Sequence, residues 1–261
     1  MPFKLTPLKY FARAAVAALA FCGAPSWADS IAYTFDDGPT LDATPQLSPR
    51  QRNDALLAVL AKHQIKSVLF ITSGNGTNRA EGYPLARAWG EAGHLVGNHT
   101  VTHPDLNAPA VTLAQYQQEV LDCDAAIRTL PNYRKWFRFT FLNDGNTPEK
   151  RDGMRSFLRQ QHYRAAPVTF AVLDWEFNDK LIAALKADPK ADVQPIRQAY
   201  LDTVRKNAQA SLAKAPADRV HTILLHHNLV NAMWLEDVVT LLESMGFTST
   251  PAAEVYAHLP D

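Results

Sequence analysis

Short apolar runs alternate along this chain with segments in which apolar residues recur every three or four positions. A short apolar run is typical of a strand buried in a parallel sheet, whereas the longer period is typical of an amphipathic helix. The pattern predicts strands over residues 30–35, 67–71, 95–97, 136–141, 169–173 and 220–225. It predicts helices over residues 84–93, 179–215 and 235–245, and over the segments that follow Asn53, Thr112 and Thr147.

Polar residues at the predicted helix starts sharpen several of these boundaries. Asn53 is a suitable N-cap for the first helix, and Thr112 forms a capping box with Gln115. Thr147 is followed by a proline and a glutamate, which favour the first turn of a helix. Two prolines are expected to interrupt the helical stretch 179–215.

Strand and helix alternate over about 230 residues, without an internal repeat or a low-complexity linker. This order predicts one α/β domain with parallel strands, in an open sheet or a closed barrel. Several polar residues stand at the carboxyl ends of predicted strands, namely Asp36, Asp37, His99, Arg138, Asp174 and His226. A β/α barrel gathers its chemistry at that face, so their placement favours a barrel.

The first 28 residues have the pattern of a secretory signal peptide. Cationic residues precede the apolar run Ala14–Ala20, and Ser26 and Ala28 supply small residues at the −3 and −1 positions of a cleavage site. The run is too short to span a bilayer, although a retained anchor is the alternative. We therefore expect cleavage after Ala28 and a domain over residues 29–261. That domain is expected in the periplasm or secreted into the medium, with no membrane span.

Charge and cysteine content narrow the possible functions. The chain has 26 Lys+Arg and 26 Asp+Glu, and residues 1–28 hold three of the former and none of the latter. Cleavage therefore leaves 23 cationic against 26 anionic residues, a net charge of −3. Without a basic excess, nucleic acid is not expected as a partner. Cys123 is the one cysteine after residue 28, so no internal disulfide is expected.

Residues 34–39, Thr-Phe-Asp-Asp-Gly-Pro, end the first predicted strand with two adjacent carboxylates. Neighbouring side chains of an extended segment point in opposite directions, so Asp36 and Asp37 can take different roles. His99 and His103 follow with His-x3-His spacing. One carboxylate and two imidazoles suit zinc and leave a coordination position open. Taken alone, the two histidines also fit a helix face or a buried pair.

Residues 34–39 and 99–103 resemble the first two motifs of the polysaccharide deacetylases of the NodB homology type, carbohydrate esterase family four. Three weaker matches follow in the family's order, so the resemblance extends from Ile31 to about Phe247. It implies an irregular seven-stranded (β/α) barrel, formed as a single domain after the signal peptide.

The resemblance also implies a hydrolytic site with one divalent metal ion, for which we expect zinc. Asp37, His99 and His103 are the implied metal ligands. Asp36 is the implied general base, with a supporting role on a histidine as the alternative. His226 is the implied acid that protonates the leaving nitrogen.

The last two motifs add residues around that acid. Asp174 resembles the aspartate that orients the acid histidine and raises its pKa, with an ordinary strand-end aspartate as the alternative. Trp175 and Leu224 resemble the residues that enclose the acetyl methyl group, although the pattern alone places both in the core. His227 competes with His226 for the acid role. Strand alternation turns it away, so we expect His227 either to support a neighbouring site residue or to have a structural role.

Residues 138–141, Arg-Phe-Thr-Phe, are where the chain departs most from the family. Many members carry Arg, two prolines and Tyr, and here Thr140 and Phe141 replace the second proline and the tyrosine. Arg138 can still pair with Asp36, and the backbone N–H of Phe141 remains available to stabilise an oxyanion. The lost phenol puts one substrate hydrogen bond in doubt.

These residues predict a metal-dependent hydrolase that removes N-acetyl groups from an acetylated amino-sugar polysaccharide or oligosaccharide. Peptidoglycan, chitin-type and poly-N-acetylglucosamine chains all fit as substrates. A hydrolase of small amides, cyclic imides or O-acetyl esters would use nearly the same site. A non-catalytic glycan-binding protein is the third hypothesis, and it predicts that a ligand, the base or the acid is missing.

Overall fold

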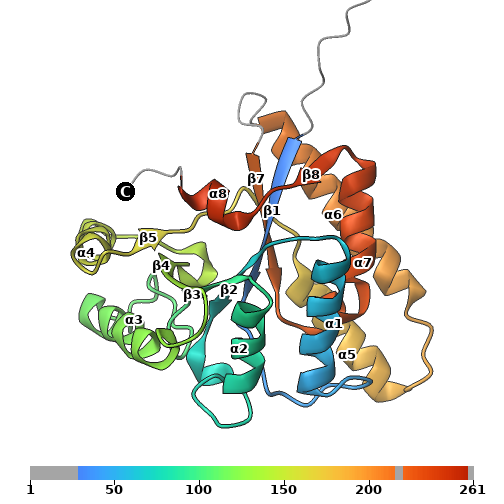
Figure 1. The fold of residues 1–261 in the computed structure, drawn as a ribbon, viewed down its shortest axis with the longest axis horizontal. Helices are drawn as coiled ribbons and strands as arrows, with labels where there is room; N and C mark the ends of the chain where they lie inside the picture. Colours follow the sequence, from blue (N-terminus) through green and yellow to red (C-terminus); the bar gives the residue numbers. More distant parts are fainter. Residues whose placement is uncertain (1–28, 215–219, 258–261) are drawn as a thin grey trace, which may run out of the picture.

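A parallel β-sheet forms the centre of the computed structural model, which describes residues 29–214 and 220–257. The predicted signal peptide and its cleavage site lie outside the described residues. The strands are β1 (Asp29–Asp36), β2 (Val68–Ile71), β3 (Leu95–Asn98), β4 (Tyr133–Phe137), β5 (Arg164–Ala165), β6 (Phe170–Ala171), β7 (Val220–His226) and β8 (Phe247–Ser249). Their order is β5-β4-β3-β2-β1-β7-β6, with β8 on β1 (Figure 1).

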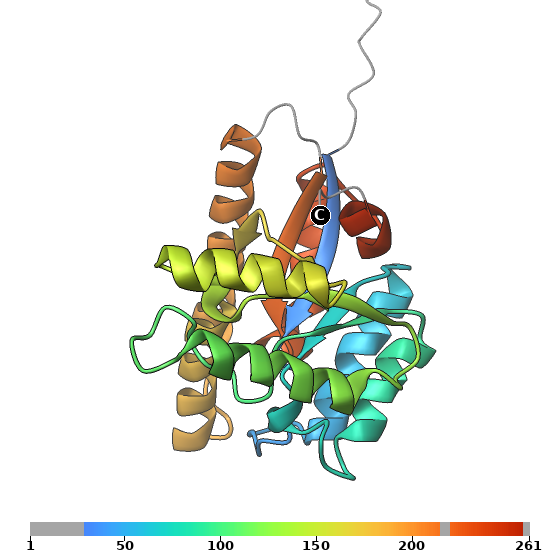
Figure 2. The ribbon, with the colours of Figure 1, turned by 90° about the vertical axis from the view of Figure 1, so that its left-hand side faces the viewer.

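The helices lie around the outside of this sheet (Figures 1 and 2). They are α1 (Pro49–Lys62), α2 (Tyr83–Glu91), α3 (Leu113–Ile127), α4 (Pro148–Gln160), α5 (Asp174–Ala187), α6 (Gln194–Lys214), α7 (Leu229–Ser244) and α8 (Ala252–Ala257). Two 3-10 turns are η1 (Ser73–Asn75) and η2 (Thr140–Leu142). Figure 2 shows α3 and α4 side by side across one end of the sheet.

The sheet curls so that its two outer strands, β5 and β6, are consecutive in the chain and joined by residues 166–169. The strand ladders along the path are all parallel. The predicted single-domain, irregular seven-stranded (β/α) barrel is therefore confirmed. In addition, β8 pairs with the first three residues of β1.

The central strand β1 holds the arrangement together. It pairs with β2 through Thr34 and Phe35 and with β7 over seven consecutive residues. The β1–β7 register sets Asp36 directly opposite His226. Two polar residues that are far apart in the sequence therefore meet at one edge of the sheet.

Local signals explain which helix boundaries were predicted well. The capping box of Thr112 with Gln115 opens α3, and Thr147 caps α4, as predicted. The prediction that Asn53 caps the first helix is wrong. Ser48 forms a capping box with Gln51 and Pro49 takes the first helical position, so α1 starts one turn earlier.

Three boundaries near the predicted site residues also differ from the prediction. The strand expected over 136–141 ends at Phe137, because the chain then enters η2, where Phe141 has a left-handed φ of 55°. The strand expected over 169–173 is only two residues long, and α5 already begins at Asp174. Helix α7 begins at Leu229 instead of residue 235, because Asn228 caps it.

The main buried core lies between the sheet and the helices α1, α2, α5, α6 and α7. It includes Phe35, Leu69, Val96 and Leu225 from the strands, with Trp89 from α2. A second buried cluster lies under α3 and α4. Among the described residues, no helix has the length and apolar content needed to cross a membrane.

Candidate active site

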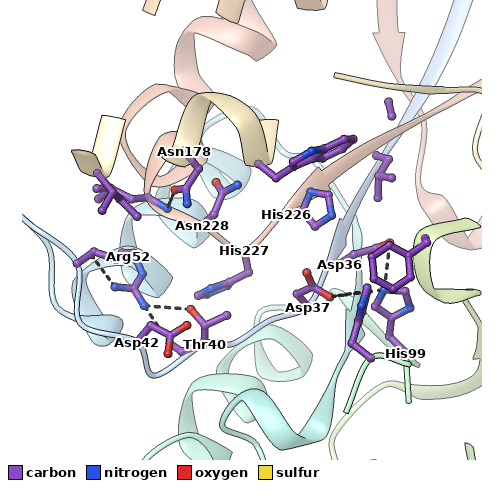
Figure 3. A pocket seen from close by; sticks show the side chains of 18 of the residues that line it. Asp36, Asp37, Thr40, Asp42, Arg52, His99, Asn178, His226, His227 and Asn228 are labelled. Carbon is purple, nitrogen blue, oxygen red and sulfur yellow. Dashed lines mark hydrogen bonds and ion pairs between the residues drawn. The ribbon is translucent and has the colours of Figure 1, made fainter. Parts of the chain in front are cut away.

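A pocket of about 670 Å³ opens where the carboxyl ends of β1, β3 and β7 meet (Figure 3). Eight of the ten predicted site residues line it: Asp36, Asp37, His99, His103, Phe141, Trp175, Leu224 and His226. The other two, Arg138 and Asp174, are buried beside Asp36 and His226. The fold thus brings all ten residues to one place.

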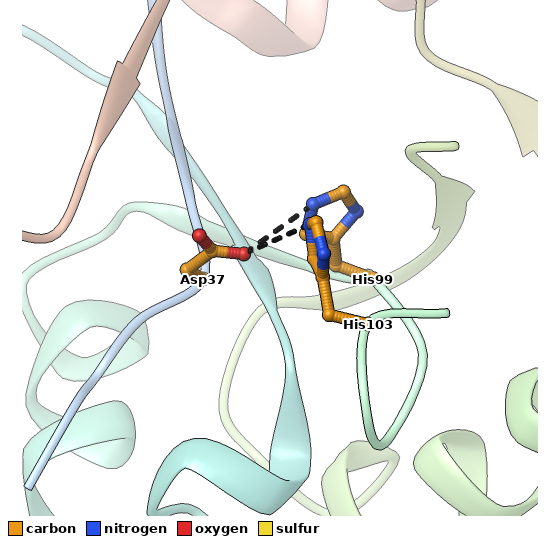
Figure 4. Close-up of side chains that lie close together, drawn as sticks. All are labelled: Asp37, His99 and His103. Carbon is orange, nitrogen blue, oxygen red and sulfur yellow. Dashed lines mark ion pairs between the residues drawn. The ribbon is translucent and has the colours of Figure 1, made fainter. Parts of the chain in front are cut away.

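Asp37, His99 and His103 form a compact group at the edge of this pocket (Figure 4). One ligand atom from each residue lies within 4.8 Å of the others. Asp37 Oδ1 is 3.6 Å from His99 Nε2 and 3.4 Å from His103 Nε2. Burial alone would raise the pKa of Asp37, but the charges of His226, His99 and His103 lower it below its usual value.

Hydrogen bonds orient these donor atoms. His99 Nδ1 lies 2.7 Å from the carbonyl oxygen of Arg138, which only accepts, so we assign the ring proton to Nδ1. The lone pair of His99 Nε2 then faces Asp37. Thr72 Oγ1 donates to Asp37 Oδ1 at 3.3 Å. One carboxylate and two imidazoles with a free lone pair fit a divalent metal such as zinc.

Asp36 and Arg138 form a buried ion pair beside this group. Arg138 Nη1 donates to the two Asp36 carboxylate oxygens at 3.4 and 3.3 Å. The same guanidinium donates to Thr34 Oγ1 and to the hydroxyl of Tyr256. Asp36 Oδ2 is also 3.6 Å from His99 Nε2. The carboxylate is therefore fixed next to the group of possible metal ligands.

His226 and Asp174 form a second charged pair. Asp174 Oδ1 is 2.6 Å from His226 Nδ1, and Asp174 Oδ2 accepts from the His226 backbone N–H at 2.7 Å. Asn228 and Asn231 also donate to Asp174 Oδ2. Burial lowers the pKa of His226, but Asp174, with help from Asp37 and Asp36, raises it overall to about 10.

The neighbouring His227 also lines the pocket (Figure 3), but it is buried, whereas His226 is half-buried. Its Nε2 is 3.1 Å from Asn53 Oδ1, which also accepts from the indole N–H of Trp89. Burial and the nearby charge of Arg52 lower the pKa of His227 to about 4. Its contacts are those of a buried, neutral side chain.

Aromatic side chains flank the two charged pairs. Phe141 is 60% exposed, and its ring packs edge-on against His103 at 4.5 Å. Trp175 is 40% exposed, and its ring packs edge-on against His226 at 5.5 Å. Leu224 is buried in the pocket wall. Trp175 therefore lies at the pocket surface, and its alternative placement in the core is wrong.

Sequence reasoning missed several residues that support the site: Thr72, Tyr200, Asn231 and Tyr256. Tyr200 donates to Asn231 Oδ1, and Asn231 in turn donates to Asp174. Asn231 occupies the first turn of α7, just after the cap, which is the one local signal that it carries. Tyr256 lies about 30 positions beyond the last motif, without a pattern around it.

Comparisons with known proteins identify the family of this chain. The sequence model of the polysaccharide deacetylase family matches residues 24–157, about half of the chain. A peptidoglycan-N-acetylglucosamine deacetylase of Bacillus cereus is 31% identical over 121 residues, which is 46% of this chain and 38% of that protein. The chain thus spans only about two fifths of the curated relatives that it matches.

Solved structures show the same fold. A chitin deacetylase from Colletotrichum lindemuthianum aligns over 90% of each chain, with a TM-score of 0.65 and 18% identity. A pseudoenzyme of carbohydrate esterase family four from Bacillus anthracis aligns over 85% of this chain and 63% of its own, with a TM-score of 0.58 and 16% identity. The family match covers β1 and β3 and the residues that follow them, including Asp37, His99 and His103, so the chain belongs to the polysaccharide deacetylase family.

Proposed function

We propose that this protein removes N-acetyl groups from an acetylated amino-sugar polymer or oligomer by metal-dependent hydrolysis. One observation carries the proposal: the fold gathers a possible metal site, a buried carboxylate and a charged histidine around one pocket. Such a set contains what amide hydrolysis needs, namely activation of water and of the carbonyl group, a proton acceptor and a proton donor.

Asp37, His99 and His103 would hold one divalent ion, and their donor types favour zinc. When bound, the ion supplies Lewis-acid activation of a water molecule and of the acetyl carbonyl group. The remaining steps fall to side chains of this chain.

Asp36 accepts the proton of the attacking water as the water oxygen bonds to the acetyl carbon. The ion pair with Arg138 keeps the carboxylate in place for that transfer. The Asp174 carboxylate raises the pKa of His226, which favours the protonated ring. It gives this proton to the sugar nitrogen as the carbon–nitrogen bond breaks, leaving acetate and a free amine.

The pocket walls bind and orient the acetyl group in this proposal. The backbone N–H of Phe141 stabilises the oxyanion, which needs only the backbone and so tolerates the lost phenol. Trp175 and Leu224 enclose the methyl group. The names of the relatives support peptidoglycan-type and chitin-type chains as the substrates to test first.

The N-terminal pattern supports export, with cleavage after Ala28 and action outside the cytoplasm. N-terminal sequencing of the exported protein tests this part alone. A mature chain that begins at a lipid-modified Cys22, the cysteine just after the apolar run, would contradict it.

Acetate release from zinc-loaded protein tests the function, using chitooligosaccharides, peptidoglycan and poly-N-acetylglucosamine as substrates. We expect release from at least one polymer, and its loss in the matched Asp36→Asn variant. Release from small amides, imides or O-acetyl esters alone would favour the second hypothesis. Glycan binding without any release would favour the non-catalytic one.

A further inference from the structure

The loop that joins His99 to His103 has an unusual backbone. Thr100 has φ of 71° and His103 has φ of 58°, and both are residues other than glycine. Left-handed conformations at such residues are unfavourable, so they persist only where surrounding contacts impose them. Contacts that hold this loop therefore also decide where the His103 imidazole lies.

Glu119, in the middle of α3, accepts hydrogen bonds from this loop. Its Oε2 accepts from the backbone N–H of Val101 at 2.9 Å and from that of Thr102 at 2.7 Å. Its Oε1 accepts from the hydroxyl of Thr102 at 2.9 Å. One half-buried side chain thus makes three hydrogen bonds to the two residues before His103.

The other hydrogen bonds of this loop involve different backbone groups. Asn98 Oδ1 accepts from the Thr100 N–H, and Thr100 Oγ1 accepts from the His103 N–H. The backbone N–H groups of Ser73 and Gly74 donate to the carbonyl oxygens of Thr100 and Val101. For the consecutive N–H groups of Val101 and Thr102, the acceptor is Glu119.

We propose that Glu119 is a positioning residue, which fixes His103 for metal binding without touching the metal itself. The inference rests on the metal site of the proposed function. Glu119 acts through the length of its side chain and the position of its acceptor oxygens, and not through its negative charge. Side chains that orient metal ligands typically contribute ~10–100-fold to metal affinity.

Two substitutions distinguish the effect of the length of the Glu119 side chain from the effect of its charge. Glu119→Asp keeps the charge but is shorter by one methylene, roughly 1.5 Å, and so withdraws the carboxylate from the loop. Glu119→Gln keeps the length, because its amide oxygen can accept from both N–H groups while its NH2 donates to Thr102 Oγ1. We expect Glu119→Asp and Glu119→Ala to weaken zinc binding ~10–100-fold, and Glu119→Gln to stay within about threefold of the parent protein.

The measurement is zinc affinity by competition with a chromophoric chelator, with the melting temperature of each metal-free protein recorded beside it. Asp122→Ala is the matched control, because it removes an exposed carboxylate of the same helix, one that accepts a hydrogen bond from Gln118. It should leave zinc affinity unchanged.

The outcomes are distinct. Unchanged affinity in folded Glu119→Asp overturns the inference, as does equal weakening in Glu119→Gln, which would show that charge is what matters. If Glu119→Ala does not fold, the zinc affinities of Glu119→Asp and Glu119→Gln still test the inference. A parent protein that binds no zinc refutes the proposed metal site instead, which is a separate result.

Discussion

The backbone changes conformation between Asp36 and Asp37. Asp36 is the last residue of β1 and stays in register with His226, whereas Asp37 has a left-handed φ of 69°. Asp36 consequently turns to Arg138, while Asp37 turns to the imidazoles of His99 and His103. Two adjacent carboxylates can therefore carry different roles.

Substituting each carboxylate by its amide separates those roles. Asp37→Asn should lose zinc and activity together, because a neutral amide oxygen is a poor substitute for an anionic ligand. Asp36→Asn should keep its zinc but lose ~10²–10⁴-fold in kcat, the usual contribution of a general base. The zinc content per chain and the rate of acetate release distinguish the metal ligand from the general base. If Asp36→Asn empties the site and Asp37→Asn does not, the two assignments are reversed.

The Asp174 carboxylate is a main cause of the raised pKa of His226, so its removal should move the pH profile. An acid is active while protonated, and activity therefore falls as pH rises through the pKa of His226. Asp174→Asn lowers that pKa and should shift the alkaline limb of kcat to lower pH. Asp144→Asn, in an exposed pair with Arg155, is the control and should leave the limb in place. An alkaline limb that stays fixed in Asp174→Asn would remove His226 as its source.

At the scale of elements, α1 and α7 pack together and share a charged contact. His63 ends α1 and lies between two carboxylates of α7, with Nε2 3.1 Å from Glu236 and Nδ1 3.0 Å from Glu243. Burial lowers the pKa of His63, but Glu236 and Glu243 raise it overall above its usual value. The contact is therefore strongest when both ring nitrogens carry protons.

This contact makes stability depend on pH. A raised pKa in the folded state gives a contribution that is complete below the unfolded value of about 6.5 and disappears as pH rises through the folded value. His63→Gln should thus cost ~0.5–1 kcal/mol in free energy of unfolding near pH 6, and less at pH 9. Urea titrations of both proteins at the two pH values measure this. A larger cost at pH 9 would contradict the assignment.

Element boundaries were predictable where the signal is local. The caps at Thr112 and Thr147 lie within four residues of the N–H groups that they bond. The end of β4 was not predictable, because aromatic residues alternate with Arg138 and Thr140 past the end of the strand and into η2. Asp174 was predicted to stand at the end of a strand over residues 169–173. The strand β6 is shorter and ends at Ala171, and Asp174 is the first residue of α5.

At the scale of the molecule, the site joins two distant parts of the chain. The possible metal ligands come from residues 37–103, and the Asp174–His226 pair comes from α5 and β7. The motifs predicted these residues because each carries a local pattern. Their partners Glu119, Asn231 and Tyr256 are single polar residues on helices, and sequence spacing does not reveal which neighbour they meet.

Metal removal should weaken the fold without abolishing it, since the main core lies between sheet and helices. Zinc at a hundredfold excess over Kd should add ~2.7 kcal/mol to the free energy of unfolding. For a domain of this size, that corresponds to a rise in Tm of roughly 5–10 °C. Calorimetry with zinc and with chelator measures it, and Asp37→Asn should show no such rise. Complete unfolding in chelator would instead identify a structural metal.

The pairing of β1 with β7 also bears on how the protein refolds. Thr34 Oγ1 donates to the Ile223 carbonyl oxygen across 189 residues, and Asp36 faces His226 in that same ladder. Pairing of such distant segments is slow, because the entropy of closing the intervening loop is lost before the contacts form. The proposed proton acceptor and donor meet only when the two halves of the chain have joined. Recovery of the proposed activity after denaturation should therefore report the completion of folding.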